Sequence, residues 1–390
     1  MPSTLLKWAS VGVLVVIGLA LIARRRTQLS QEASIQIGLS KSPNHATGSE
    51  IALLAFKAAS KHILALIGCT PTMKPDPTHP QRIKLPYIYM QGLLHIDEND
   101  ERMYNKAVKS NTADNLISPM FLIAQTLPLM IHILADRACP VLPLGSVNTR
   151  NTFKIRRPHL AQDIGALRRA SQDGNLSYRV YFGGHDRPGY RRKRGVEFCT
   201  TIVVLYEGEP EITMDLWVLQ FMPTSFEPRF VPDTHEQDQK PLKEDIDGTD
   251  LHKIHIDARD PHNWAASTKD YNPIHVSPIG AKLFGFKSVI AHGNHLVALA
   301  VEELRHEAVK GGSGPASKAR QMLWEGADPI VLEARFVRPT SLPAESSITW
   351  QSCQKNKSEI RYEMKSRDKL TSGTFYSSAN NTYSRPCIGS

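Results

Sequence analysis

Residues 267–300 read STKDYNPIHVSPIGAKLFGFKSVIAHGNHLVALA, and the interpretation of the whole chain starts from this stretch. It places Asp270 and His275 on either side of an Asn-Pro pair. Proline fixes its own φ and disfavours the α region for the residue before it, so we expect a rigid turn rather than a helix. Such a turn would hold two proton-exchanging side chains close together.

Two helices are predicted after this turn. Ser277-Pro278 combines a favoured N-cap with proline at the first helical position, and Gly285 is suited to close that short helix. Apolar residues then recur at helical spacing, which predicts a longer helix over 293–310. Gly293 stands at the N-terminus of this longer helix, where free N–H groups favour a developing negative charge.

These groups together suit one type of reaction. Addition of water to a double bond beside a thioester carbonyl requires a group that activates water, a proton donor for the α-carbon and donors for the enolate oxygen. Asp270 and His275 offer the first two functions, and the N–H of Gly293 offers the third. A lone D-x-N-P-x-H string is also compatible with a simple Asx-type turn, so the hypothesis depends on the second motif, Ala-His-Gly at 291–293.

The two motifs, DYNPIHVSP at 270–278 and GFKSVIAHG at 285–293, resemble the MaoC-like dehydratases, which include the (R)-specific enoyl-CoA hydratases called hydratase 2. The resemblance implies that Asp270 and His275 are catalytic and that Gly293 forms the oxyanion hole. It covers about residues 82–379.

Three further residues are assigned to substrate binding. Asn272 matches the family's structural Asn, Tyr271 stands beside the matched Asp, and His292 also shapes the turn before Gly293. One position departs from the resembled family, which usually has Gly immediately before the Asp, whereas this chain has Lys269. A positive charge there is expected to lower the pKa of the Asp carboxyl or to narrow the entrance to the site.

The rest of the chain predicts an α+β protein with two similar halves. An apolar helix from Met120 precedes a run of strands, and Pro128 is expected to kink or break that helix. A Pro-rich acidic linker follows at 223–250, after which the order of long helix and strands repeats. With the resemblance, this implies a double hotdog, in which two long helices are each wrapped by antiparallel sheet. The non-catalytic half would span 82–222 and the catalytic half 251–390. Strands are predicted near 144–155, 176–182, 196–206, 212–222, 330–337, 347–353, 360–366 and 373–379.

Residues 1–26 are predicted to form a single-pass transmembrane helix in front of the double hotdog. The apolar run from Trp8 to Ala23 is near the lower limit for spanning a bilayer, and three arginines follow it at 24–26. Because the stronger charge lies behind the run, a cleaved signal peptide is disfavoured and the catalytic body is expected in the cytosol. An organellar targeting segment or an organellar membrane stays open.

Residues 27–81 are predicted to contain a juxtamembrane spacer and an amphipathic helix that begins near Ser49. This helix is apolar nearly all round, except for a narrow stripe of Glu50, Lys57 and Lys61. It is expected either to lie in the membrane interface or to dock on the catalytic body.

No metal and no cofactor are predicted. The five cysteines are scattered and form no CxxC pair, which favours a reducing compartment. His252-x-x-His255 and His292-x-x-His295 lack carboxylate or cysteine partners at ligand spacing. The sequence also contains no phosphate-cradling or dinucleotide-binding glycine motif.

The charge balance leaves several kinds of partner open. A formal net charge of +9 is compatible with nucleic acid, anionic lipid or an anionic cofactor. The predicted anchor argues against nucleic acid. The expected partners are therefore the membrane and an acyl-CoA or acyl-carrier-protein thioester. The two halves are expected to pair within one chain, although an oligomer is possible.

The leading hypothesis is a membrane-anchored hydratase or dehydratase that interconverts trans-2-enoyl and (3R)-hydroxyacyl thioesters in fatty-acid or related acyl-CoA metabolism. One alternative is a catalytically silent hotdog that binds acyl thioesters or acts as a scaffold at a membrane. A second alternative is a hotdog thioesterase, which would share the fold but hydrolyse the acyl bond.

Overall fold

The computed structural model describes residues 34–66, 73–110, 116–144, 146–222, 250–311, 314–326, 328–352, 359–366 and 369–377. Its helices are η1 (Pro43–His45), α2 (Gly48–Leu66), α3 (Glu98–Val108), α4 (Met120–Ala135), α5 (Pro158–Gln162), α6 (Ile164–Gln172), α7 (Asp260–Thr268), α8 (Pro273–Val276), α9 (Pro278–Leu283), α10 (Gly293–Val309), α11 (Pro315–Ala319) and η3 (Arg320–Glu325). Its strands are β1 (Ile35–Gln36), β2 (Lys74–Pro75), β3 (Arg82–Lys84), β4 (Ile88–Leu93), β5 (Val147–Ile155), β6 (Leu176–Phe182), β7 (Gly189–Arg192), β8 (Gly195–Tyr206), β9 (Glu209–Phe221), β10 (Asp250–Ile256), β11 (Ile330–Phe336), β12 (Ala344–Ser352), β13 (Glu359–Ser366) and β14 (Lys369–Ser377).

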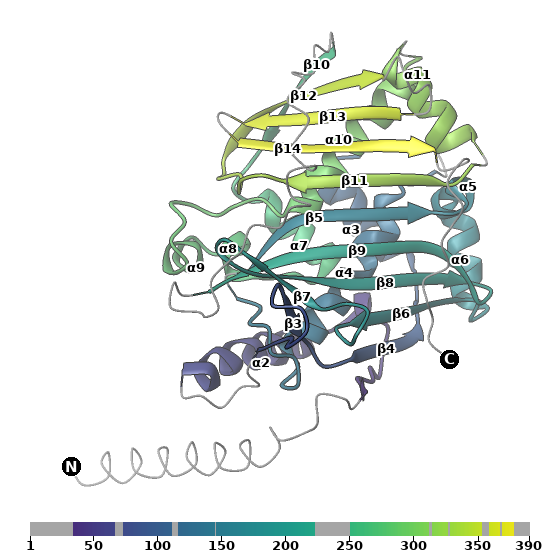
Figure 1. Cartoon of the computed structure of the whole chain (residues 1–390). Coiled ribbons are helices and arrows are strands. Elements are labelled where there is room, and N and C mark those ends of the chain that lie inside the picture. Colours follow the sequence, from purple (N-terminus) through teal and green to yellow (C-terminus); the bar gives the residue numbers. More distant parts are fainter. Residues whose placement is uncertain are drawn as a thin grey trace, which may run out of the picture.

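One long sheet forms the front of the molecule, and α3, α4, α7 and α10 lie together behind it (Figure 1). The strand order is β1-β4-β6-β8-β9-β5-β11-β14-β13-β12-β10, with the short β2, β3 and β7 beside this path. Among the described pairs, only β1 with β4 is parallel. The α+β prediction is confirmed, and the predicted strands agree with the observed ones to within a few residues.

The sheet is built from two runs of strands that meet at β5 and β11. These strands pair antiparallel from Ile155–Ile330 to Arg150–Arg335, so that backbone hydrogen bonds join the two halves within one chain. On the first side of this seam, α4 contacts β4, β6 and β8. A single hydrophobic core runs through both halves and includes residues of both α4 and α10.

Burial differs between strands, since β8 is buried at every position from Gly195 to Leu205, whereas β6 is covered on one face. β6 alternates buried and half-buried residues along its whole length, as expected of a strand with one face on the core. On β5 the inward positions near its end are Asn151, Phe153 and Ile155, all of them buried. An amide therefore occupies a position where the pattern calls for an apolar side chain.

One local prediction is wrong, and a second is wrong in part. Pro273 begins the short helix α8 rather than a non-helical turn, because proline is well tolerated in the first turn of a helix. Helix α4 runs without interruption through Pro128, so a break is absent, while the alternative of a kink stays a prediction. The surrounding core, rather than the hydrogen bond that Pro128 cannot donate, keeps this segment helical.

Helix α2 docks on the catalytic body but leaves one apolar side uncovered. Lys61 is buried, and its Nζ donates a hydrogen bond of 2.6 Å to the backbone oxygen of Leu134 at the end of α4. Leu53, Phe56 and Ile63 are exposed, Phe56 to 70%. The docking alternative is therefore correct for one side of this helix.

The predicted anchor at 1–26 lies outside the described residues. Among the helices that the structure describes, none is long and apolar enough to cross a membrane. Residues 223–249 of the predicted linker also lie outside the described residues, and Asp250 begins β10.

Candidate active site

The motif residues come together where three short segments converge on the N-terminus of α10. Helix α7 ends at Thr268, and Asp270 follows in the loop before α8. His275 lies in α8, while His292 is the N-cap of α10 and Gly293 its first residue. Thr268 Oγ1 bonds back to the carbonyl of Trp264 in the preceding turn, so the loop leaves a well-fixed helix end.

Asp270 is held by its own turn. Its Oδ1 accepts a hydrogen bond of 3.2 Å from the backbone N–H of Asn272. Burial raises the pKa of the Asp270 carboxyl, while the nearby His275 and the bond from Asn272 act in the opposite direction. About a quarter of the side chain remains exposed, so the carboxyl lies near the protein surface.

His275 has one ring nitrogen fixed by the backbone. Its Nδ1 lies 2.8 Å from the carbonyl oxygen of Ile290, which can only accept a hydrogen bond, so Nδ1 carries the proton. In the neutral ring, Nε2 then keeps its lone pair. Burial lowers the pKa of His275, so the ring is mainly neutral at pH 7 and suited to act as a base.

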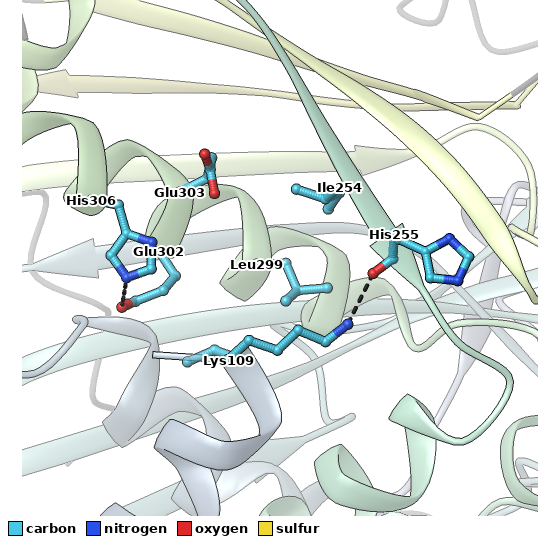
Figure 2. A pocket seen from close by; sticks show the side chains of 8 residues that line it. Lys109, Ile254, His255, Leu299, Glu302, Glu303 and His306 are labelled. Atoms are coloured by element: carbon cyan, nitrogen blue, oxygen red, sulfur yellow. Dashed lines mark hydrogen bonds and ion pairs between the residues drawn. The ribbon is translucent and has the colours of Figure 1, made fainter. Parts of the chain in front are cut away.

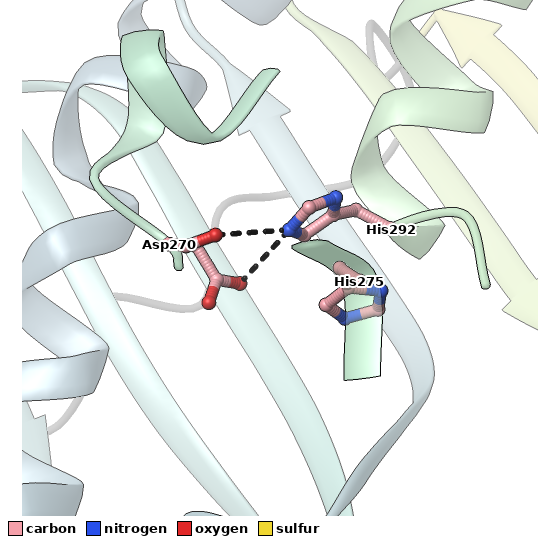
Figure 3. A group of neighbouring side chains, drawn as sticks. All are labelled: Asp270, His275 and His292. Carbon is pink, nitrogen blue, oxygen red and sulfur yellow. Dashed lines mark hydrogen bonds and ion pairs between the residues drawn. The ribbon is translucent and has the colours of Figure 1, made fainter. Parts of the chain in front are cut away.

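His292 connects the two catalytic candidates (Figure 3). Its Nε2 lies 3.1 Å from the backbone oxygen of Asp270 and 3.7 Å from Oδ2 of the same residue. Its ring stacks on that of His275, with the centroids 3.7 Å apart and the planes inclined by 25°. Burial lowers the pKa of His292 well below its usual range, so this ring stays neutral and donates from Nε2.

The spacing of these groups suits a bound water molecule. One nitrogen or oxygen from each of Asp270, His275 and His292 lies within 4.8 Å of the others. A water between two such groups can make hydrogen bonds of ordinary length to both. The arrangement can therefore hold a nucleophilic water and exchange protons with it.

The close packing at position 293 requires a glycine. A Cβ added there would come within 2.9 Å of the ring of Phe336 at the end of β11. The absence of a side chain thus lets the start of α10 approach the sheet closely. The first N–H groups of a helix have no acceptor within the helix, so they are available to an oxyanion.

The residues assigned to substrate binding differ in their contacts and in their exposure. Asn272 caps α8, since its Oδ1 accepts a bond of 3.4 Å from the N–H of Ile274. Tyr271 is 38% exposed beside Asp270, and burial of the remainder raises the pKa of its hydroxyl. Substrate contact by Asn272, Tyr271 and His292 stays a prediction.

Lys269 has a different role from the expected one. It adopts the left-handed conformation with φ 55°, which glycine adopts without strain, and it ends α7. Its Nζ donates to the carbonyl oxygen of Ala266 at 2.6 Å. The Lys269 ammonium group therefore bonds to its own helix, and the pKa of the Asp270 carboxyl is raised rather than lowered. The alternative, that Lys269 narrows the entrance to the site, stays a prediction.

The structure brings carboxylates to the histidines although the sequence has none at ligand spacing, so the expectation that these histidines lack carboxylate partners is wrong. His252 Nδ1 lies 3.3 Å from Glu303 Oε1, and Glu307 completes this group. Asp270, His275 and His292 form a second such group. In that group, His275 Nδ1 and His292 Nε2 are already bonded to backbone carbonyls. That the chain uses no metal stays a prediction.

A separate cleft of about 170 Å³ lies between α3, β10 and α10 (Figure 2). Leu299, Glu302 and His306 line it from α10, and Lys109 faces them from the end of α3. Lys109 Nζ bonds to the carbonyl oxygen of His255 at 2.9 Å and to Asp260 at 2.7 Å. The cleft contains none of the motif residues.

Comparison with known proteins gives a match to one family model. Residues 239–321 match the family described as MaoC like domain. A curated relative, 3-hydroxyacyl-thioester dehydratase X of Mycobacterium tuberculosis, is 35% identical over 85 residues, which are 22% of this chain and 24% of that protein. The sequence match thus spans about a quarter of the relative's length.

Similarity in fold to solved structures covers a much larger part of this chain. The crystal structure of HtdX of Mycobacterium tuberculosis covers 74% of this chain and 99% of its own, with a TM-score of 0.53 and 18% identity. A second crystal structure of HtdX gives a TM-score of 0.52 and 19% identity. The predicted hotdog fold is therefore confirmed.

Sequence reasoning missed two residues that contact the start of α10. Phe336 packs on Gly293, and Asn151 of β5 bonds to Asn294, the residue after that glycine. Both lie on strands that are distant from the motif in sequence. The only signal for Asn151 in the sequence was a polar residue at an inward-facing strand position, and recognising it requires the correct register of β5.

Proposed function

We propose that this chain adds water to trans-2-enoyl thioesters, or removes it from 3-hydroxyacyl thioesters. The observation that carries the proposal is the pairing of Asp270 with a neutral His275 whose Nε2 is unprotonated, at the N-terminus of α10. The match of residues 239–321 to the MaoC like domain supports it, as does the name of the mycobacterial relative, 3-hydroxyacyl-thioester dehydratase X.

In the proposed reaction, a water molecule lies between the Asp270 carboxylate and His275 Nε2. Its oxygen bonds to the β-carbon as one proton passes to this pair, and a proton from the same site is added to the α-carbon. The N–H of Gly293 stabilises the negative charge on the thioester oxygen as the enolate forms. Water is thereby added with no other reactant. The resemblance supports the (R) product.

The test measures loss of the conjugated double bond by ultraviolet absorbance, with a panel of trans-2-enoyl-CoA substrates of different chain length. Asp270→Asn and His275→Ala should each lower the rate by about a hundredfold or more while leaving the fold intact. Near-normal turnover by either variant would rule out the mechanism. Release of free thiol would instead show a thioesterase. Binding without either reaction would instead show a catalytically silent protein.

We also propose one active site per chain. The first half, 82–222, contains no D-x-N-P-x-H string, and β5 pairs with β11 to complete the sheet. The non-catalytic half would then act as a permanent partner of 251–390. Titration with a tight hydroxyacyl-CoA analogue should give one site per polypeptide, and a value of two would contradict this division. Whether the carrier is coenzyme A or acyl carrier protein is tested by offering both thioesters.

A membrane location is proposed for the same chain. The apolar run at 8–23 with its following arginines supports an anchor, and the exposed Leu53, Phe56 and Ile63 on α2 support contact with the bilayer surface. Deletion of residues 1–26 should make the protein extractable by carbonate while it stays active. In that truncated protein, Phe56→Ser should weaken binding to anionic vesicles. Carbonate-resistant retention of the truncated protein would contradict the anchor.

A further inference from the structure

The non-catalytic half contributes a buried amide to the start of α10. Asn151 of β5 is 1% exposed, and its Nδ2 lies 2.5 Å from Oδ1 of Asn294. Asn294 directly follows Gly293 and is itself buried. A buried amide is costly unless its hydrogen bonds are made, so this contact constrains both side chains.

A backbone group of β9 fixes the orientation of the Asn151 amide. It lies beside a β-bulge, where the register between β5 and β9 shifts between Asn148 and Arg150. The N–H of Trp217 donates to Asn151 Oδ1 at 3.3 Å. Since Oδ1 accepts this bond, Nδ2 is the end that faces Asn294.

Asn151 also lies on the seam between the halves. It is the register partner of Ala334 on β11, the strand that ends in the Phe336 ring beneath Gly293. The start of α10 is thus held from two sides, by the Phe336 ring and by an amide of the non-catalytic half.

We propose that Asn151 is a positioning residue, which holds the N-terminus of α10 so that the N–H of Gly293 points at the thioester oxygen. The inference rests on the proposed function. It gives the non-catalytic half a part in the chemistry although that half touches no reacting atom. A shift of about 1 Å in a catalytic group is enough to cost on the order of a hundredfold in rate.

The test uses the full chain with Asn151→Leu, Asn294→Ala and the double variant. Asn294→Ala keeps the bond between Asn151 and Trp217, so it tests the contact between the halves without disturbing β5. Thr152→Ala, on the next and outward-facing position of β5, is the matched control. Each protein is assayed for kcat and KM with enoyl-CoA, and for amide hydrogen exchange in the peptide that covers residues 289–300.

Each single variant should lower kcat by about tenfold to a hundredfold, change KM by less than about twofold and speed exchange at the start of α10. The double variant should be no slower than the worse single variant, because both remove one contact. Thr152→Ala should match the wild type. Unchanged kcat and exchange in Asn294→Ala, or multiplicative effects in the double variant, would overturn the inference. An inactive wild-type protein would refute the proposed function instead. Amide hydrogen exchange in residues 289–300 would then still test whether Asn151 holds the start of α10.

Discussion

His292 donates from Nε2 to the backbone oxygen of Asp270 at 3.1 Å, and so ties the loop that carries the carboxylate to the start of α10. The two residues are 22 positions apart in sequence. The same imidazole stacks on His275, so one buried ring contacts both proton-exchanging candidates. We infer that His292 positions the site rather than titrating in it, because burial keeps the ring neutral.

Substitutions of His292 can distinguish its stacking on His275 from its hydrogen bond to the backbone of Asp270. His292→Phe keeps a flat ring against His275 but removes the donor to Asp270, so the loop should be held less firmly. We expect kcat to fall by about tenfold to a hundredfold, corresponding to about 1.4 to 2.7 kcal/mol of activation free energy. His292→Gln, which keeps a donor, should recover part of the loss. Wild-type kcat in a folded His292→Phe protein would show that the bond has no catalytic role.

Gly293→Ala tests the close approach of α10 to the sheet. The added methyl would meet the Phe336 ring at 2.9 Å, so the helix start must shift or the ring must move. We expect a loss of about 1 to 3 kcal/mol in unfolding free energy together with a large fall in kcat. Phe336→Leu in the same protein should restore stability and part of the activity. Gly48→Ala, where nothing lies within 4 Å, is the neutral control.

Much of this fold could be predicted because local rules decide it. The N-cap at Ser277 accepts a bond from Gly280 as expected, and helix α10 begins at Gly293 as the apolar spacing indicated. The predicted antiparallel strands follow from period-two burial. These features depend on residues within about ten positions of one another.

The missing features depend on contacts between distant segments. Asn151 and Asn294 are 143 positions apart, and no local pattern relates them. The expectation that His252 has no carboxylate partner failed for the same reason, since Glu303 approaches His252 of β10 from α10. The expected lowering of the Asp270 pKa by Lys269 is wrong, and the Lys269 side chain bonds back to Ala266, which sequence alone does not show.

Lys269→Gly tests this last point. Glycine removes the strain of a left-handed residue, worth about 1 kcal/mol, but also removes the bond from Nζ to the Ala266 carbonyl. These effects oppose each other, so the unfolding free energy should change by less than about 1 kcal/mol. Activity should be preserved or raised. Lys269→Val, with a β-branched side chain at positive φ, should destabilise the protein clearly. A large loss of activity in Lys269→Gly would mean that the ammonium group acts in catalysis.

The stability of the fold should fall in weak acid because of His295. This side chain is fully buried in α10, and its Nε2 bonds to the carbonyl of Ala107 while its ring stacks on Trp264. Burial lowers the pKa of His295 to about 4, against a usual value near 6.5. The unfolded chain therefore binds a proton at this position over a range of pH where the folded chain does not.

As the pH falls from about 6.5 to 4, this difference should remove on the order of 3 kcal/mol of unfolding free energy, and above about pH 6.5 no such penalty applies. Burial lowers the pKa of His275 and of His292 too, so they act in the same direction.

Urea unfolding of the wild type and of His295→Gln at several pH values measures the effect. The variant should be less stable than the wild type at pH 7.5, since it loses the stack on Trp264, but its stability should depend less on pH. His185→Gln, at a 97% exposed side chain, should keep the wild-type slope. Equal pH dependence in His295→Gln and the wild type would show that His295 does not titrate differently on unfolding.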